Sequence, residues 1–148
     1  MNPLKNLNNI IKLFNNISEN EKIYLLINYA DKYLLYTPLP KEKFDLEDIR
    51  KDQECYDEIT ILLKVNKQQK INLKFKLKSE VQTFTKAIIT IFCEAFNNCY
   101  IYDILKINDN ILNKIIGKDL FRLRTQNLYY ILKRIKNICK IYLIKINS

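Results

Sequence analysis

Apolar residues in the first quarter of the chain recur at intervals of three and four, which is the spacing of one face of an amphipathic helix. The pattern predicts a first helix over about residues 4–17 and a second from residue 19 to about residue 35. Ser18 and Glu21 stand three residues apart at the start of the second helix, where their side chains can bond reciprocally to two free amides. We therefore expect two N-terminal scaffold helices.

A change of pattern follows the prolines at positions 38 and 40, which end the second helix. Up to about residue 54 the chain is charged and shows no periodicity, so we expect a long surface connection there. Residues 59–65 and 71–77 then alternate between apolar and polar types, and they predict an antiparallel hairpin. Its apolar face should pack on helices, and its lysine-rich face should be solvated.

Helical spacing returns after residue 78 and continues to the C-terminus. Ser79 with Gln82 forms a second capping pattern, which opens the most apolar helix of the chain and the expected core, ending near Phe96. Short helical pieces are predicted at 102–106 and 109–116, and a long helix at 121–146. Five basic residues of the long helix are expected to face water: Arg122, Lys133, Arg134, Lys136 and Lys140. The order of elements predicts one α+β domain over residues 1–148, with a small antiparallel sheet flanked by helices.

The length of 148 residues and the hydrophobic content of 48% fit a single globular domain. The longest apolar runs are far shorter than the roughly 20 residues that span a bilayer, and the N-terminus lacks the pattern of a signal peptide. Four cysteines without a secretory signal fit free thiols in a reducing compartment. We expect a cytoplasmic protein, or a stromal one if an organellar leader was removed, with no membrane contact.

The net charge of +9 raises the possibility of a nucleic-acid partner. The charge comes mostly from lysine, whereas arginine is the residue that gives bidentate contacts to phosphate and guanine. Residues 45–58 also hold seven acids against two bases, so phosphate would be repelled from this part of the chain. A nucleic-acid role is therefore the alternative reading, and it would use the lysine face and the tyrosines at 56, 100, 129 and 130 as stacking groups.

Candidate chemistry is restricted by the residue types that are present. The chain has no histidine and no closely spaced cysteine pair, so we expect neither a metal nor another cofactor. It has no glycine-rich phosphate loop and no base beside a cysteine, so a self-contained enzyme is disfavoured. Cys55 stands in a polar stretch before the hairpin, in the kind of loop that carries function. Cys93 is expected to be structural, and Cys99 to be open to solvent.

The order of elements and three short motifs together resemble the SufE family, over about residues 8–139. The stretch Gln53-Glu54-Cys55-Tyr56-Asp57-Glu58-Ile59-Thr60 aligns with the family's Gly-Cys-x-Ser-x-Val-Trp signature. Ser79-Glu80 matches the Ser-Asp pair before the core helix, and Arg124-Thr125-Gln126-Asn127-Leu128 resembles the Arg-x-x-Gly-Leu motif. The resemblance implies a SufE/IscU-like two-layer fold.

The resemblance also implies a function, that of a sulfur acceptor in iron-sulfur cluster assembly. Cys55 would carry a persulfide taken from a cysteine desulfurase (SufS-like), stimulate that enzyme, and pass the sulfur to a scaffold complex (SufBCD-like). Glu80, Arg124, Ser79 and Asp57 would bind the partner or support the loop of Cys55.

Carboxylates beside Cys55 change this picture in one respect. Glu54 and Asp57 replace the family's glycine and serine, and with Glu58 they disfavour a thiolate and would raise the pKa of Cys55. A third hypothesis is therefore a degenerate acceptor, which still docks to the desulfurase and regulates it but transfers little sulfur.

Overall fold

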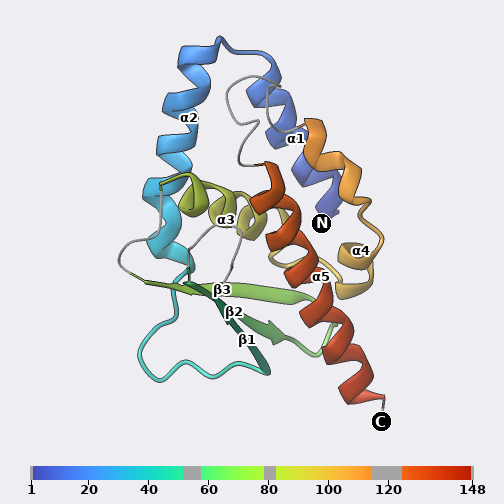
Figure 1. Cartoon of the computed structure of the whole chain (residues 1–148). Coiled ribbons are helices and arrows are strands. Elements are labelled where there is room, and N and C mark those ends of the chain that lie inside the picture. The colour runs from blue at the N-terminus through green and yellow to red at the C-terminus, as the bar shows by residue number, and fades with distance from the viewer. Residues whose placement is uncertain (1, 52–57, 79–82, 115–124, 148) are drawn as a thin grey trace.

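The computed structural model describes residues 2–51, 58–78, 83–114 and 125–147. Helices pack against a three-stranded antiparallel sheet, so the predicted α+β class is confirmed (Figure 1). The elements in chain order are α1 (Pro3–Asn15), α2 (Glu19–Asp31), the 3-10 helix η1 (Lys32–Tyr36), β1 (Leu46–Lys51), β2 (Glu58–Val65), β3 (Ile71–Leu77), α3 (Thr83–Phe96), α4 (Ile101–Leu105), the 3-10 helix η2 (Asp109–Lys114) and α5 (Thr125–Ile146).

Both N-terminal helices begin at capped ends, as their sequences require. The side chain of Asn2 accepts hydrogen bonds from the amides of Leu4 and Lys5 at the start of α1. At the start of α2, the Ser18 hydroxyl accepts from the Glu21 amide, and the Glu21 carboxylate accepts from the Ser18 amide. The predicted capping box is therefore confirmed. The chain then tightens into η1, so the last part of the predicted second helix is 3-10 rather than α.

The predicted hairpin is confirmed, with β2 and β3 antiparallel from the pair Ile59 and Leu77 to the pair Val65 and Ile71. The connection between them closes on Asn66, whose side chain accepts from the amides of Gln68 and Lys70.

The sheet has a third strand that the sequence did not predict. β1 pairs antiparallel with β2 at the edge of the sheet, within the stretch expected to be a surface connection. Leu46 packs against the core on one side of β1, but Asp48 on the same side is a half-buried acid, and Ile49 on the other side is 64% exposed. The alternation of apolar and polar residues did not predict β1, because a carboxylate rather than an apolar side chain occupies an inward position.

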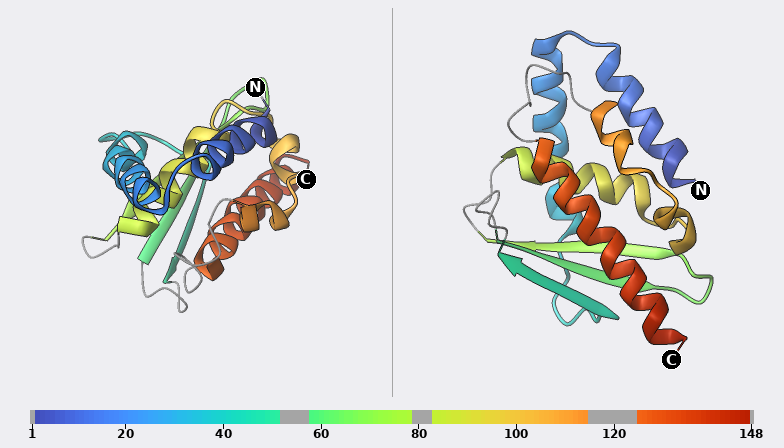
Figure 2. Two further views of the ribbon diagram at one scale, coloured as in Figure 1. Left: turned by 90° about the horizontal axis from the view of Figure 1, so that it is seen from above. Right: turned by 45° about the vertical axis from the view of Figure 1, so that its right-hand side comes forward.

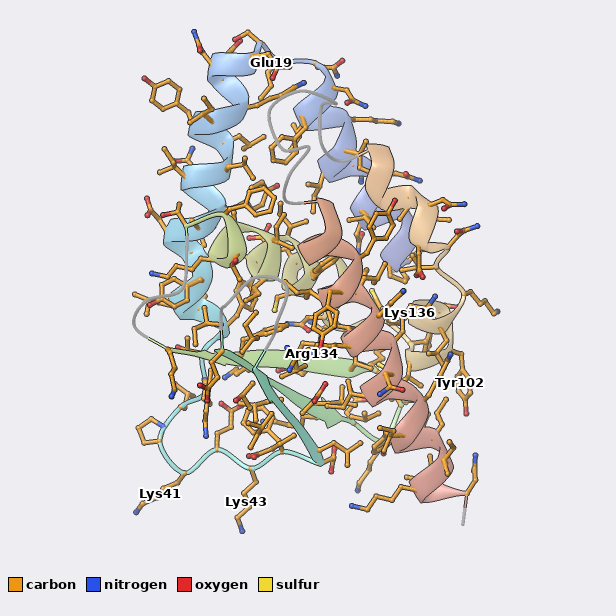
Figure 3. All side chains as sticks on the ribbon, viewed as in Figure 1. Glu19, Lys41, Lys43, Tyr102, Arg134 and Lys136 are labelled. Atoms are coloured by element: carbon orange, nitrogen blue, oxygen red, sulfur yellow. The ribbon has the colours of Figure 1, made fainter. Side chains whose placement is uncertain are left out.

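The lysine-rich face of the sheet is only partly solvated, contrary to expectation. Leu62 on this face is fully buried, and the side chain of Lys74 is 15% exposed. The Glu42 carboxylate, from the segment before β1, accepts hydrogen bonds of 2.7 Å from both Lys64 and Lys74. Figure 3 shows Lys41 and Lys43 of the same segment pointing away from the sheet. Asp45 of the same segment also accepts a hydrogen bond of 2.8 Å from the Val65 amide, so two acids hold this segment on the sheet.

Substitution of Glu42 by glutamine is expected to lower stability at pH 7. Burial raises the pKa of Glu42, but the hydrogen bonds from Lys64 and Lys74, together with the Leu39 amide, outweigh it and lower the pKa from 4.5 to about 2. A carboxyl whose pKa is lower when folded contributes stability above pH 4.5, and this contribution is lost as the pH falls toward 2. Because solvent partly screens the charge of Lys64, we expect Glu42→Gln to lower the free energy of unfolding by about 2 kcal/mol, which is less than the full pKa change implies.

Urea unfolding at pH 7 and at pH 3 measures this effect. The difference between wild type and Glu42→Gln should shrink at pH 3, where the wild-type contribution is already partly lost. Glu19→Gln is the matched control, because Glu19 pairs with Lys22 at the surface and should change stability little. Equal stability of wild type and Glu42→Gln at pH 7 would contradict this account.

The predicted core helix is confirmed as α3, which lies between the N-terminal helices and the sheet (Figures 1 and 2). Its described residues include a nearly continuous buried set: Phe84, Thr85, Ala87, Ile88, Ile89, Thr90, Ile91, Phe92, Cys93, Ala95 and Phe96. Such burial on all sides is what the high apolar content of this helix predicts. Among the described residues, no helix is both long enough and apolar enough to cross a membrane.

The C-terminal part follows the predicted order of α4, η2 and α5. α5 crosses the sheet and contacts both β1 and β2 (Figure 1). Arg134 was expected to face water, but its side chain is 1% exposed. Lys136 is also largely covered, with 18% of its side chain exposed. Lys133 and Lys140 are exposed, as predicted.

Candidate functional site

Three of the four cysteines lie in the interior. Cys93, Cys99 and Cys139 each have an exposed fraction of 0% and are free thiols. The expectation that Cys99 is open to solvent is wrong. The chain after α3 pairs with β3, where the Ile71 amide donates to the Cys99 carbonyl at 2.9 Å, and this pairing draws the Cys99 side chain inward.

The buried thiols are poor nucleophiles at neutral pH. Burial raises the pKa of Cys93 and of Cys99, and it raises the pKa of Cys139 to about 12. The carboxylates of Glu94 and Asp103 raise the pKa of Cys93 and Cys99 further. Because the thiolate is the attacking form, burial and a raised pKa disfavour these three thiols as nucleophiles and favour a packing role for them. Cys55 is the remaining candidate for thiol chemistry.

The predicted site residues Cys55, Asp57, Ser79, Glu80 and Arg124 all lie outside the described residues. The structure therefore does not place their side chains. It does place the residues that border the segments to which they belong, and these residues limit where each segment begins and ends.

Two of these segments leave from the same end of the sheet. Lys51, the last residue of β1, is paired with Glu58, the first residue of β2, so residues 52–57 join adjacent strand ends. The Lys78 amide donates to the Glu58 carbonyl at 3.4 Å, and the Lys78 ammonium lies 2.9 Å from the Glu58 carboxylate.

The helices that follow the Ser79-Glu80 and Arg124 motifs, α3 and α5, begin on the same side of the molecule. Figure 2 shows the first described turn of α3 and the first turn of α5 on the side where β1 ends and β2 begins. The topology thus directs the chain positions next to Cys55, Ser79-Glu80 and Arg124 to one side.

The acidic run of residues 45–58 is partly neutralised. The Glu58 carboxylate pairs with Lys78, and the Asp48 carboxylate pairs with the Arg134 guanidinium at 3.2 Å. Lys78 is 70% exposed, so its pair with Glu58 is weak. At least two of the seven acids in this run therefore have a basic partner.

Arg134 is the residue that the sequence analysis missed. Its Nε atom donates to Asp48 Oδ2, and its Nη2 atom donates to the carbonyls of Asp48 and Ile59 at 3.1 and 2.8 Å. Figure 3 shows Arg134 where α5 crosses the sheet. A signal was available, because Arg134 occupies a position of the apolar stripe of α5, three residues after Ile131 and four before Ile138.

Lys136 makes a second polar link from α5, in a different direction. Its Nζ atom donates to the Ile107 carbonyl at 2.8 Å and to the Asp109 carboxylate at 3.2 Å. This link ties α5 to the segment between α4 and η2. Of these two links, that of Arg134 reaches the sheet and that of Lys136 does not.

The described residues contain no group of three or more histidine, cysteine, aspartate or glutamate side chains that could hold a metal ion. A hollow of about 510 Å³ is lined by Asn2, Leu4, Asn8, Asp103, Lys106, Ile107, Asn108, Asn110 and Ile111. It lies beside the start of α1, and its described lining includes no cysteine.

Comparison with known proteins supports the fold alone. No family model and no curated protein matches the sequence. A hypothetical protein from Thermus thermophilus, whose solution structure is known, is similar in structure, with a TM-score of 0.75 and 19% sequence identity. The similarity covers 94% of this chain and 96% of that one.

Proposed function

We propose that this protein is a sulfur acceptor that takes persulfide sulfur from a cysteine desulfurase on Cys55. The Cys55 thiolate attacks the outer sulfur of the enzyme's persulfide, the sulfur-sulfur bond breaks, and the enzyme's cysteine leaves as a thiolate. Cys55 then carries the persulfide to an iron-sulfur cluster scaffold. The protein acts as a carrier and as an activator of the desulfurase.

The observation that carries the proposal is the contrast between the cysteines. Three of them are buried and have a raised pKa, whereas Cys55 belongs to a short connection between two paired strand ends. Carrier chemistry needs a thiol that the partner can reach and that can ionise, and the burial of Cys93, Cys99 and Cys139 disfavours all three for this role.

The order of the described elements supports the resemblance to the SufE family. Two helices come first, Cys55 falls between the first two strands, and the core helix follows Ser79-Glu80. The last helix follows Arg124. We assign Glu80, Arg124, Ser79 and Asp57 to partner binding or to support of the Cys55 segment.

Alanine release by the desulfurase tests the proposal. With cysteine as substrate, addition of this protein should increase the rate of alanine formation, because an acceptor clears the enzyme's persulfide. The degenerate-regulator hypothesis predicts altered alanine release without sulfur on Cys55. No binding to the desulfurase and no change in its rate would contradict both hypotheses.

The nucleic-acid alternative has weaker support in the structure. Of its stacking candidates, Tyr100 is 46% exposed, but the ammonium of Lys70 lies 5.3 Å from its ring centroid. Tyr129 and Tyr130 are half-buried. If the lysines nevertheless bound a phosphate backbone, affinity for single-stranded RNA would fall steeply with salt. We expect weak binding with a shallow salt dependence in a fluorescence-anisotropy titration, and a steep slope at submicromolar affinity would contradict this expectation.

A further inference from the structure

The guanidinium of Arg134 links α5 to β1 and β2, the two strands that border residues 52–57. Arg134 of α5 donates to the carbonyl of Asp48 in β1 and to the carbonyl of Ile59 in β2. Ile59 lies four residues after Cys55 in the sequence, and Asp48 seven residues before it. Arg134 therefore fixes the two strands that border this connection relative to each other and to α5.

Stability alone does not account for an arginine at this position. Burial of a charged group costs free energy that ion pairing recovers only in part. The Nη1 atom of Arg134 is buried and has no hydrogen-bond partner among the described residues, so the compensation is incomplete. Apolar residues at both position 134 and position 48 would continue the apolar stripe of Ile131, Ile135 and Ile138 without this cost.

The planar fork of arginine suits a different task. Its two donating nitrogens hold a carboxylate and two backbone carbonyls in a fixed arrangement, which the single ammonium of lysine cannot reproduce. An arrangement of this kind adds geometric specificity, because it fixes the positions of the backbone groups that it contacts.

We infer that Arg134 is a positioning residue for the acceptor thiol, through its hold on β1 and β2. This inference rests on the proposed function. In this inference Arg134 acts through the strands: it holds Asp48 of β1 and Ile59 of β2, on either side of residues 52–57, in the arrangement that sulfur transfer needs within the complex. Loss of the guanidinium should therefore slow transfer without weakening the complex.

The test compares Arg134→Met with Lys136→Met, a matched control that removes the other polar link of α5. Each variant is mixed with a saturating cysteine desulfurase and with cysteine. Mass spectrometry follows the rate of sulfur loading on the peptide that contains Cys55, and calorimetry gives the dissociation constant. We expect Arg134→Met to slow loading within the complex roughly 10-fold with an unchanged dissociation constant, and Lys136→Met to leave both unchanged.

Several outcomes would overturn the inference. Loading of Arg134→Met at the wild-type rate would do so, and so would equal slowing in both variants, which would indicate general loosening of α5. A wild-type protein that takes up no sulfur would overturn the proposed function and this inference together. If Arg134→Met does not fold, Arg134→Lys replaces it, with slowed loading expected, and wild-type loading by that variant would overturn the inference.

Discussion

Replacement of Cys55 by serine is expected to abolish sulfur uptake from a cysteine desulfurase. A serine hydroxyl cannot attack a persulfide at neutral pH or retain the transferred sulfur, so the loss should exceed about 100-fold. The remaining thiols are buried and have a raised pKa, and they should not substitute for Cys55. Uptake is measured with isotopically labelled cysteine, and circular dichroism should show an unchanged fold.

Cys99→Ser provides the matched control for this result. Cys99 is buried, and its Sγ atom lies within hydrogen-bond distance of the Ala95 carbonyl, an acceptor that a serine hydroxyl can also use. This variant should take up sulfur at the wild-type rate. Retention of uptake by Cys55→Ser, or its loss in a folded Cys99→Ser protein, would contradict the assignment of Cys55 as the acceptor.

Arg134→Met is expected to lower the free energy of unfolding by about 3 kcal/mol, because removal of one member of a buried, hydrogen-bonded ion pair is strongly destabilising. The Asp48 carboxylate is 13% exposed, and the carbonyls of Asp48 and Ile59 also lose a donor. For a domain of this size the melting temperature should fall by roughly 10 °C. Urea unfolding followed by circular dichroism measures the change.

The double variant Asp48→Leu/Arg134→Met separates the loss of a partner from the loss of packing. Apolar residues in place of both charges remove the desolvation cost together with the pair, so the double variant should recover at least half of the loss. The free energies of unfolding of the double variant and of the two single variants complete a double-mutant cycle. A cost below about 1 kcal/mol for Arg134→Met, or a double variant less stable than Arg134→Met, would contradict a coupled buried pair.

Local sequence patterns predict the elements whose signals are local. The capping box of Ser18 and Glu21 uses atoms three residues apart, and the hairpin of β2 and β3 rests on alternation within each strand. The burial of α3 follows from its apolar content on all sides. In each case the residues that form the structure are near one another in the sequence.

The features that the sequence did not reveal depend on contacts between distant residues. Asp48 makes β1 look like a charged connection, and Arg134 looks like a solvated position of α5, yet each is the other's partner across 86 positions. The position of Arg134 in the apolar stripe of α5 indicates that its side chain is covered, but the local pattern does not identify Asp48 as its partner. The burial of Cys99 is hidden for a similar reason, because it depends on pairing with Ile71 of β3.

The candidate site is predicted from motifs, and its side chains lie outside the described residues. The described residues show that the other three thiols are buried. They also show that the strand ends before and after residues 52–57 are paired. They also add Arg134, which no motif indicates.

Peptide mapping by mass spectrometry tests the central claim most directly. The wild-type protein is incubated with a cysteine desulfurase and cysteine, digested without reductant, and searched for peptides that have gained one sulfur atom. The account predicts the added sulfur on the peptide that contains Cys55 and its loss on reduction. Sulfur on the peptide of Cys93, Cys99 or Cys139 instead, or on no peptide while the desulfurase is bound, would contradict it.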